Sequence, residues 1–125
     1  MRYPWGDNWE PERVACHELL EKSDYLSTDT FEIGKFPKGV SDFGVEEMIG
    51  CSFEWVNDWY DAGYYQVSPA KNPQGPDHGR FKVLKGGDSN FSCDFAQIGF
   101  RMICPPDVRG WTKTQFRCVI NVPKE

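Results

Sequence analysis

Apolar and polar residues alternate most clearly over residues 53–60. Side chains at every second position of a β-strand point to the same face of the sheet. The pattern therefore predicts a strand here, with an aromatic face that enters the core. The side chains on that face are Phe53, Trp55, Asn57 and Trp59.

Other parts of the chain show weaker strand patterns and one helical pattern. Short apolar or alternating runs bounded by Gly or Pro are typical of strands. They predict four more strands, over 31–36, 81–84, 100–103 and 116–120. A helix is predicted over 11–22, because Pro11 suits a first helical position and the apolar residues recur on one side. That apolar side carries Ala15, Cys16, Leu19 and Leu20.

The remaining segments are expected to be irregular. Residues 46–49 could close one helical turn that Gly50 ends. Residues 23–30 are polar and predict a loop. Residues 61–80 contain three prolines and predict a long loop, and loops of that length usually carry function.

Composition narrows the fold class. The 125 residues suffice for one domain with one core, over 1–125. The chain has 9 Phe, 5 Trp and 5 Tyr, so large rings must fill much of that core. The 12 Gly and 9 Pro indicate many turns. We therefore predict an irregular α+β fold with short antiparallel strands and one or two short helices.

Charge and hydropathy exclude two classes of partner. The net charge is -5, and no basic stripe is present. Because phosphate backbones attract basic surfaces, we expect no nucleic-acid partner. No apolar run approaches the roughly 20 residues of a membrane helix, and the first residues lack a signal-peptide pattern. We expect a cytoplasmic protein that does not associate with membranes.

The five cysteines do not form any CxxC pair. In a reducing compartment, free and buried thiols are the favoured interpretation. A disulfide between two of Cys93, Cys104 and Cys118 stays open, because a sequence alone does not give the pairing.

Six short motifs follow one another along the chain. They are YPWGD at 3–7, FG at 43–44 with GCSFEW at 50–55, DWY at 58–60, NPQGP at 72–76, VLKGG at 83–87 and FRC at 116–118. Together they resemble, in order, the formylglycine-generating enzyme (sulfatase-modifying factor) family, a branch of the C-type-lectin-like fold. The resemblance covers only the C-terminal half of a full family domain. It implies a smaller version of the family fold, in which strands that would pair with the missing half must be covered in some other way. A homodimer is our hypothesis for how these strands are covered.

The resemblance also implies a calcium site at Glu47, Gly50, Ser52 and Glu54. The two glutamates would supply carboxylates and the other two residues backbone carbonyls, which suits a hard cation. Such an ion would be structural. The alternative is a solvated Glu47 and a Glu54 that meets an arginine such as Arg101. A second family site over 15–27 is expected to be lost, because its asparagine has become Ala15 or Cys16.

Family enzymes bind copper with two cysteines shortly after the Gly-Gly motif, and soft thiolates suit Cu(I). By family spacing these cysteines should fall near Phe91 and Ala96, but only Cys93 is present, at a shifted place. We therefore expect neither copper nor formylglycine formation. His17 and His78 are the only histidines, and their different contexts argue against a site with two histidines and a carboxylate.

These observations favour a non-catalytic module that binds a protein or a small molecule through loops. We expect the binding surface to combine the loops 64–79 and 88–94. Its candidate residues are Tyr64, Tyr65, His78, Asp88, Asn90, Cys93 and Trp111. Two alternatives stay open: a divergent metal-dependent oxidase or oxygenase that uses Cys93 with another ligand, and an oligomeric remnant without a ligand.

Overall fold

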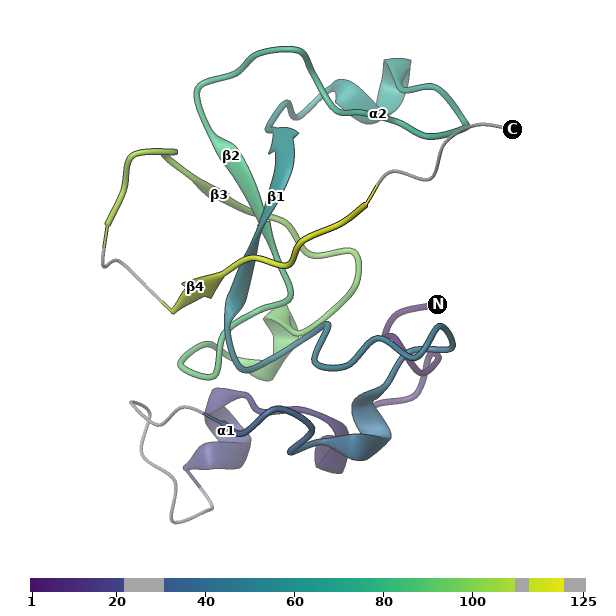
Figure 1. Cartoon of the computed structure of the whole chain (residues 1–125), viewed down its shortest axis with the longest axis vertical. Coiled ribbons are helices and arrows are strands. Elements are labelled where there is room, and N and C mark those ends of the chain that lie inside the picture. Colours follow the sequence, from purple (N-terminus) through teal and green to yellow (C-terminus); the bar gives the residue numbers. More distant parts are fainter. Residues whose placement is uncertain (22–30, 110–112, 121–125) are drawn as a thin grey trace.

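The computed structural model describes residues 1–21, 31–109 and 113–120. Its centre is a four-stranded sheet with the order β3-β2-β1-β4 (Figure 1). The strands are β1 (Phe53–Trp59), β2 (Lys82–Lys85), β3 (Met102–Cys104) and β4 (Thr114–Gln115). The pairs β1–β2 and β2–β3 are antiparallel, and β4 runs parallel to β1. The strands predicted over 53–60, 81–84 and 100–103 are thus confirmed as β1, β2 and β3. Each observed strand starts within two residues of its predicted start.

The pairing of β1 with β2 is irregular. Trp55 lies opposite Leu84 and Trp59 opposite Lys82, so four steps along β1 match two along β2. Such a bulge shifts the alternation of side chains. Phe53 is completely buried and the two tryptophans are half-buried, but Asn57 is exposed. The predicted aromatic face is therefore right except at Asn57, which the bulge turns towards solvent.

Two packed clusters form the core. Phe53, Leu84 and Cys104 are completely buried at the sheet, and further phenylalanines pack against them. The rings of Phe53 and Phe91 meet edge to face with centroids 5.2 Å apart, a favourable aromatic geometry. The second cluster, beneath the sheet, contains Tyr3, Val14, Cys16, Ile49 and Ala96.

The prediction of a single helix over 11–22 is wrong. The described part holds a 3₁₀ helix, η1 (Pro11–Arg13), and a short α-helix, α1 (His17–Leu20), with an extended segment at 14–16 between them. The backbone oxygen of Ala15 accepts a hydrogen bond from the N–H of Cys51 at 3.2 Å. A Cβ at Gly50 would collide with Val14 and with that same oxygen. Because residues 14–15 lie close to residues 50–51, the segment 14–16 is extended and does not form the middle of a helix.

Three other predictions of regular structure are wrong. Residues 31–36 form a turn, with the N–H of Lys35 bonded to the oxygen of Glu32, and not a strand. Residues 46–49 do not form a helical turn, and Glu47 has a positive φ of 54°. Residues 116–120 follow β4 without strand pairing. The predicted loop over 61–80 contains a short helix, α2 (Tyr64–Val67), that sequence reasoning missed. The predicted loop 23–30 lies outside the described residues.

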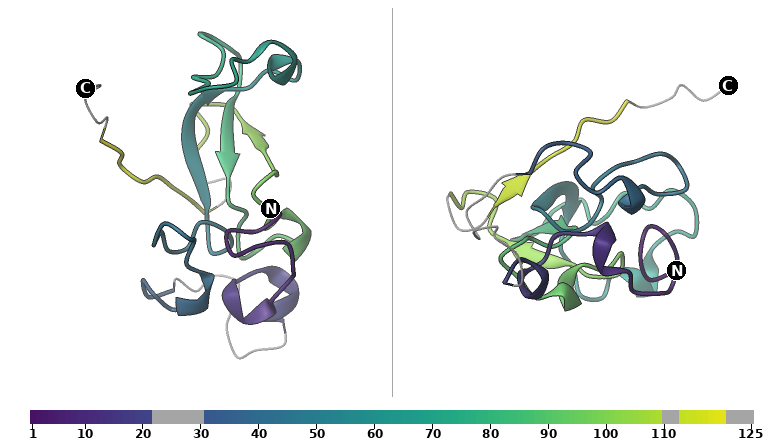
Figure 2. Two further views of the ribbon diagram at one scale, coloured as in Figure 1. Left: turned by 90° about the vertical axis from the view of Figure 1, so that its right-hand side faces the viewer. Right: turned by 90° about the horizontal axis from the view of Figure 1, so that it is seen from below.

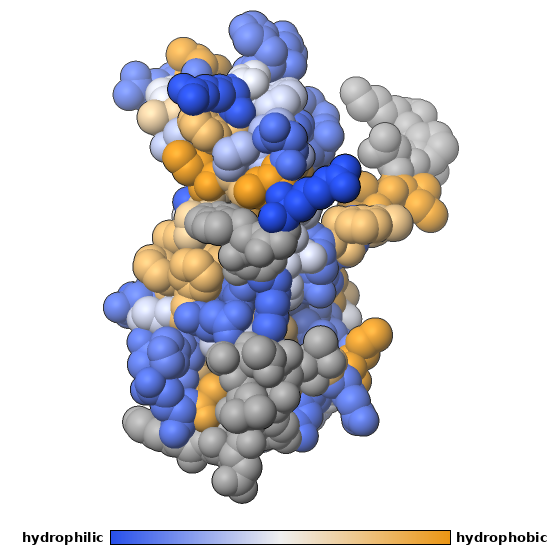
Figure 3. Space-filling view, turned by 90° about the vertical axis from the view of Figure 1, so that its left-hand side faces the viewer, coloured by the Kyte–Doolittle hydropathy of each residue, from blue (hydrophilic) through white to orange (hydrophobic). Residues whose placement is uncertain are grey.

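The sheet separates two ends of the molecule. Figure 2 shows α2 and its loop at one end, and α1 with the N-terminal segment at the other. The segment 116–120 leaves the body in both views. Figure 3 shows apolar side chains exposed among hydrophilic ones on one face, together with an apolar projection. Among the described residues, no helix has the length and apolar character needed to cross a bilayer.

Candidate functional site

A cavity of about 290 Å³ lies at the α2 end of the sheet. Its walls come from β1, β2, α2, the loop after α2 and the residue before β3. Half of the ten lining residues are aromatic or proline, and three others are charged. The lining residues are Val56, Asp58, Trp59, Tyr64, Tyr65, Pro73, Pro76, Val83, Lys85 and Arg101.

Local contacts fix the loop over the sheet. The carboxylate of Asp61 accepts the N–H of Gly63 at 2.6 Å, and the oxygen of Gly63 accepts the N–H of Gln66 at 3.0 Å, which starts α2. Gly75 has a φ of 76°, and a Cβ there would lie 3.1 Å from the Cβ of Asp58. Glycine at this position therefore lets the NPQGP turn lie against β1. The two tyrosines of α2 and the two prolines consequently face the same cavity.

Arg101 is the cation best placed for a ligand. Its guanidinium carbon lies 4.4 Å from the ring centroid of Tyr65 and 5.4 Å from that of Tyr60. Stacking of this kind holds a guanidinium in place while its edge N–H groups stay available. Within the described parts of the chain, the Arg101 side chain makes no ion pair or hydrogen bond. The arrangement can therefore bind an anion beside aromatic walls.

Lys85 also lines the cavity, but its role is structural. Its ammonium donates hydrogen bonds to the backbone oxygens of Ile98 at 2.5 Å and Phe100 at 2.7 Å. Burial and the nearby Arg101 lower the pKa of Lys85, while Asp58 acts in the opposite direction. The lysine thus ties the segment before β3 to β2. Sequence reasoning missed both Lys85 and Arg101 as site residues, because neither belongs to a binding motif.

The structure divides the predicted binding surface. Tyr64 and Tyr65 line the cavity, and His78 is exposed on the same loop but outside the lining. The loop 88–94 lies at the opposite end of β2 (Figure 1). The expectation that both loops form one surface is therefore wrong. Trp111 lies outside the described residues.

Asp88 serves the fold of its own loop. It is only 2% exposed, and its carboxylate accepts the N–H of Asn90 at 2.8 Å and the N–H of Lys113 at 3.0 Å. These contacts use both carboxylate oxygens. Asn90 itself is exposed. Asp88 therefore holds the loop to the segment before β4.

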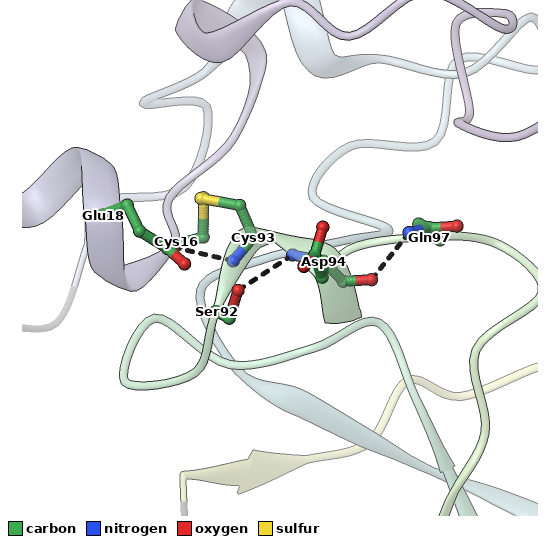
Figure 4. Close-up of a disulfide and its surroundings, with 6 residues drawn as sticks. All are labelled: Cys16, Glu18, Ser92, Cys93, Asp94 and Gln97. Atoms are coloured by element: carbon green, nitrogen blue, oxygen red, sulfur yellow. Dashed lines mark hydrogen bonds between the residues drawn. A yellow bond between two sulfur atoms is a disulfide. The ribbon is translucent and has the colours of Figure 1, made fainter.

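Cys93 forms a disulfide with Cys16, and their Cα atoms are 5.1 Å apart (Figure 4). The prediction that all thiols are free is therefore wrong for this pair, and the pairing differs from the combinations considered above. Sequence reasoning placed Cys16 on a helical face, whereas the extended segment 14–16 carries it to the loop after β2. Cys51, Cys104 and Cys118 are free.

Phe91 and Ala96, near which the resemblance places the family's copper cysteines, pack in the core. Phe91 packs edge to face on Phe53 and on Phe95, and Ala96 is 2% exposed within the second core cluster. Cys93 lies between these two positions and is bonded to Cys16. The chain therefore places apolar contacts where family enzymes carry thiolates.

Two of the four predicted calcium residues, Glu47 and Glu54, contact a protein cation, Arg117. Arg117 donates from Nε to the Glu54 carboxylate at 2.8 Å and pairs with its other oxygen through Nη2. The Glu47 carboxylate accepts the N–H of Gly34 at 3.2 Å, and the Gly50 oxygen accepts the N–H of Ser52 at 2.5 Å. Glu54 thus meets an arginine, as the alternative expected, but its partner is Arg117 and not Arg101, which lines the cavity. The calcium site stays a prediction.

Comparison with known proteins gives the family context. The sulfatase-modifying factor enzyme 1-like domain matches over residues 1–122. Formylglycine-generating enzyme of Streptomyces coelicolor is 34% identical over 118 residues, which cover 85% of this chain and 36% of that protein. Serine/threonine-protein kinase pkn1 of Chlamydia caviae is 35% identical over 79 residues, which cover 60% and 12% of the two chains.

The fold has a counterpart among solved structures. Treponema denticola variable protein 1 superposes with a TM-score of 0.65 and 24% sequence identity, over 91% of this chain and 39% of that one. The predicted irregular C-type-lectin-like fold is thus confirmed. The chain spans well under half the length of each of these relatives.

Proposed function

The chain belongs to the sulfatase-modifying factor enzyme 1-like domain family, and we propose that it is a non-catalytic module that binds a small ligand. The ligand would combine a planar ring with an anionic group, and it would occupy the cavity between α2 and the sheet. The observation that carries this proposal is the stacked guanidinium of Arg101, which makes no ion pair within the described residues.

The size and chemistry of the cavity support this ligand class. About 290 Å³ lies at the lower end of the range for small-molecule sites. Aromatic walls favour a flat ring by offset or edge-to-face contact. A guanidinium fork matches a carboxylate or phosphate with two parallel hydrogen bonds. A protein partner could satisfy the same site with a single acidic side chain beside a ring.

The lining residues favour binding over catalysis. Among the described residues that line the cavity there is no histidine or cysteine. The ammonium of Lys85 is engaged by two backbone oxygens, so it is poorly placed to act as a base or a nucleophile. Function carried by loops on a retained scaffold fits this arrangement.

The sequence identity to a formylglycine-generating enzyme supports one alternative function, that of a divergent metal-dependent oxidase. Metal analysis of the purified protein separates the two proposals. Stoichiometric copper or iron, together with oxygen consumption, would favour the enzyme. The binding module is expected to retain the cavity's ligand preference after exhaustive removal of those metals.

Matched ring ligands test the binding proposal. We expect 2-naphthoate to raise the melting temperature more than 2-naphthamide does, because only the acid offers a charge-assisted pair to Arg101. By calorimetry the acid should bind roughly tenfold more tightly. Arg101→Gln should remove this preference, and Arg109→Gln, at an exposed position outside the cavity, should keep it. Equal binding of acid and amide by the unmodified protein would overturn the proposal.

A further inference from the structure

Cys16, Glu18 and Cys93 converge beside α1 (Figure 4), at the end of the molecule opposite α2 (Figure 1). One ligand atom from each lies within 4.8 Å of the other two. Among the described residues, no other trio of histidine, cysteine or acidic side chains meets this criterion. Cys16 is buried, Cys93 is half-buried and Glu18 is exposed, so the cluster opens towards solvent through its carboxylate.

Contacts other than the disulfide hold the three residues together. The N–H of His17 donates to the oxygen of Phe91 at 3.0 Å, and the N–H of Cys93 donates to Oε2 of Glu18 at 2.8 Å. These two bonds join the start of α1 to the 3₁₀ helix η3 (Cys93–Phe95). The side chain of Cys16 also packs in the second core cluster. The cluster can therefore persist when the sulfur–sulfur bond is open.

We propose that this cluster is a redox-gated zinc site, in which reduction of the Cys16–Cys93 disulfide creates two thiolate ligands beside the Glu18 carboxylate. A dithiol reductant transfers two electrons and two protons to the sulfur–sulfur bond and closes to its own disulfide. Zinc then displaces one proton from each cysteine thiol. The oxidised state has a covalent link between α1 and η3, and the reduced state has a zinc ion in its place.

The ligand set suits zinc. Two thiolates and one carboxylate are common zinc ligands, and a water molecule reaching the open side would complete a tetrahedron. With Zn–S distances of about 2.3 Å, the two sulfurs would lie about 3.8 Å apart. That separation requires side-chain rotation and little movement of the backbone. Cu(I) needs only the two thiolates, so a contribution of Glu18 distinguishes zinc from copper.

The carboxylate is prepared for this role. It already accepts hydrogen bonds from the Ser92 side chain and from the N–H of Cys93, the latter at 2.8 Å. A carboxylate has about four acceptor positions and can keep these hydrogen bonds while it binds a cation. The negative charge disfavours free thiolates, so metal binding, rather than pH alone, should drive their deprotonation.

Spectroscopic titration tests the proposal on the full chain. The protein would be reduced with a dithiol, separated from it without oxygen, and titrated with Co²⁺ and then Zn²⁺. We expect sulfur-to-cobalt charge-transfer bands at one equivalent, which zinc abolishes, and no bands with the oxidised protein. Far-UV circular dichroism would follow folding in parallel. If the reduced chain unfolds and zinc does not restore its spectrum, the proposal is overturned.

Matched variants assign the ligands. Glu18→Gln should weaken zinc binding by roughly tenfold or more, since even outer-shell changes often cost that much. Glu21→Gln, one turn along on the same chain segment and outside the cluster, should have no effect. Cys118→Ser removes the exposed free thiol and should leave the bands unchanged. Equal affinities for the Glu18 and Glu21 variants, or bands that survive Cys16→Ser with Cys93→Ser, would overturn the site.

Discussion

The guanidinium of Arg117 forms a two-pronged ion pair with the carboxylate of Glu54 on β1. The same guanidinium donates to the backbone oxygens of Glu46 and Glu47, each at 3.2 Å. The hydrogen bond with Glu54 raises the pKa of Arg117. One side chain thus connects the segment after β4, the strand β1 and the loop that precedes it.

Loss of this connection should destabilise the fold. Arg117→Gln is expected to lower the free energy of unfolding by about 1–2 kcal/mol, because Glu54 is only 13% exposed but Arg117 is 40% exposed and partly screened. Urea denaturation measures the change. Arg109→Gln is the control at an exposed arginine. Equal stability of the two variants would show that the pair contributes little.

Calcium and Arg117 should compete for the predicted site. Calcium can use the Glu54 carboxylate only if the guanidinium leaves, because the two cations repel each other and compete for the same oxygens. We therefore expect calcium to raise the melting temperature of Arg117→Gln relative to chelator, and to raise that of the unmodified protein less. Identical midpoints with calcium and chelator in both proteins would remove the calcium site.

The thiols should differ in their reactivity. Cys118 is exposed, Cys104 is buried, and burial together with the nearby Glu47 raises the pKa of Cys51 to about 12. Because thiolates are the reactive species, iodoacetamide at pH 8 should modify Cys118 first. Mass spectrometry of peptides would show Cys16 and Cys93 modified only after reduction. Modification of either without reductant would contradict the disulfide.

The disulfide should contribute strongly to stability. It joins residues 77 positions apart, and closing a loop of that length is worth about 4 kcal/mol in the chain-entropy description. Thermal melts with and without a dithiol, in the presence of a metal chelator, measure this contribution. An unchanged midpoint after complete reduction, checked by alkylation, would contradict it.

Sequence patterns predicted the centre of this fold better than its periphery. The motif around β1 and the Gly-Gly end of β2 identified the family and two central strands, because side chains there pack in a repeating arrangement. The failures lie where tertiary contacts override local preference. The segment 14–16 is extended because the loop at Gly50 lies against it. Residues 116–120 include apolar side chains, but no strand among the described residues lies next to them.

The cavity site could be predicted only in part, because tertiary contacts also determine which residues line it. Tyr64 and Tyr65 stood out as rings in a loop, and they line the cavity. Arg101 and Lys85 come from segments distant in sequence, so only the sheet brings them together. The pairing of Cys16 with Cys93 also depends on the path of the chain, and no spacing rule gives it.

Acid titration should reveal the Glu18 contacts in the oxidised protein. The pKa of Glu18 is lowered from 4.5 by Ser92, by the N–H of Cys93 and, more weakly, by His17. A depressed carboxyl pKa contributes stability above the unfolded value, and this is lost as pH falls through the folded value. The unmodified protein should therefore exceed Glu18→Gln in stability at pH 7 and converge with it below pH 4.5. A difference that persists at pH 2 would contradict this origin.

The exposed segment after β4 should support a homodimer. Its side chains Phe116, Val119 and Ile120 are 74%, 85% and 92% exposed, and clustered exposed apolar groups usually mark interfaces. The segment is extended and does not pair with any strand of the described residues, so a second copy could add to the sheet edge. We expect light scattering at micromolar concentration to give twice the monomer mass.

Substitutions distinguish a dimer interface at this segment from nonspecific association through exposed apolar residues. Val119→Asp with Ile120→Asp should give a monomer, because charges on the segment oppose burial. Val67→Asp, on α2 and 79% exposed, should leave the dimer intact. Light scattering and analytical ultracentrifugation would measure both variants over a range of concentrations. A monomeric mass for the unmodified protein, or equal effects of the two substitutions, would contradict a dimer formed through this segment.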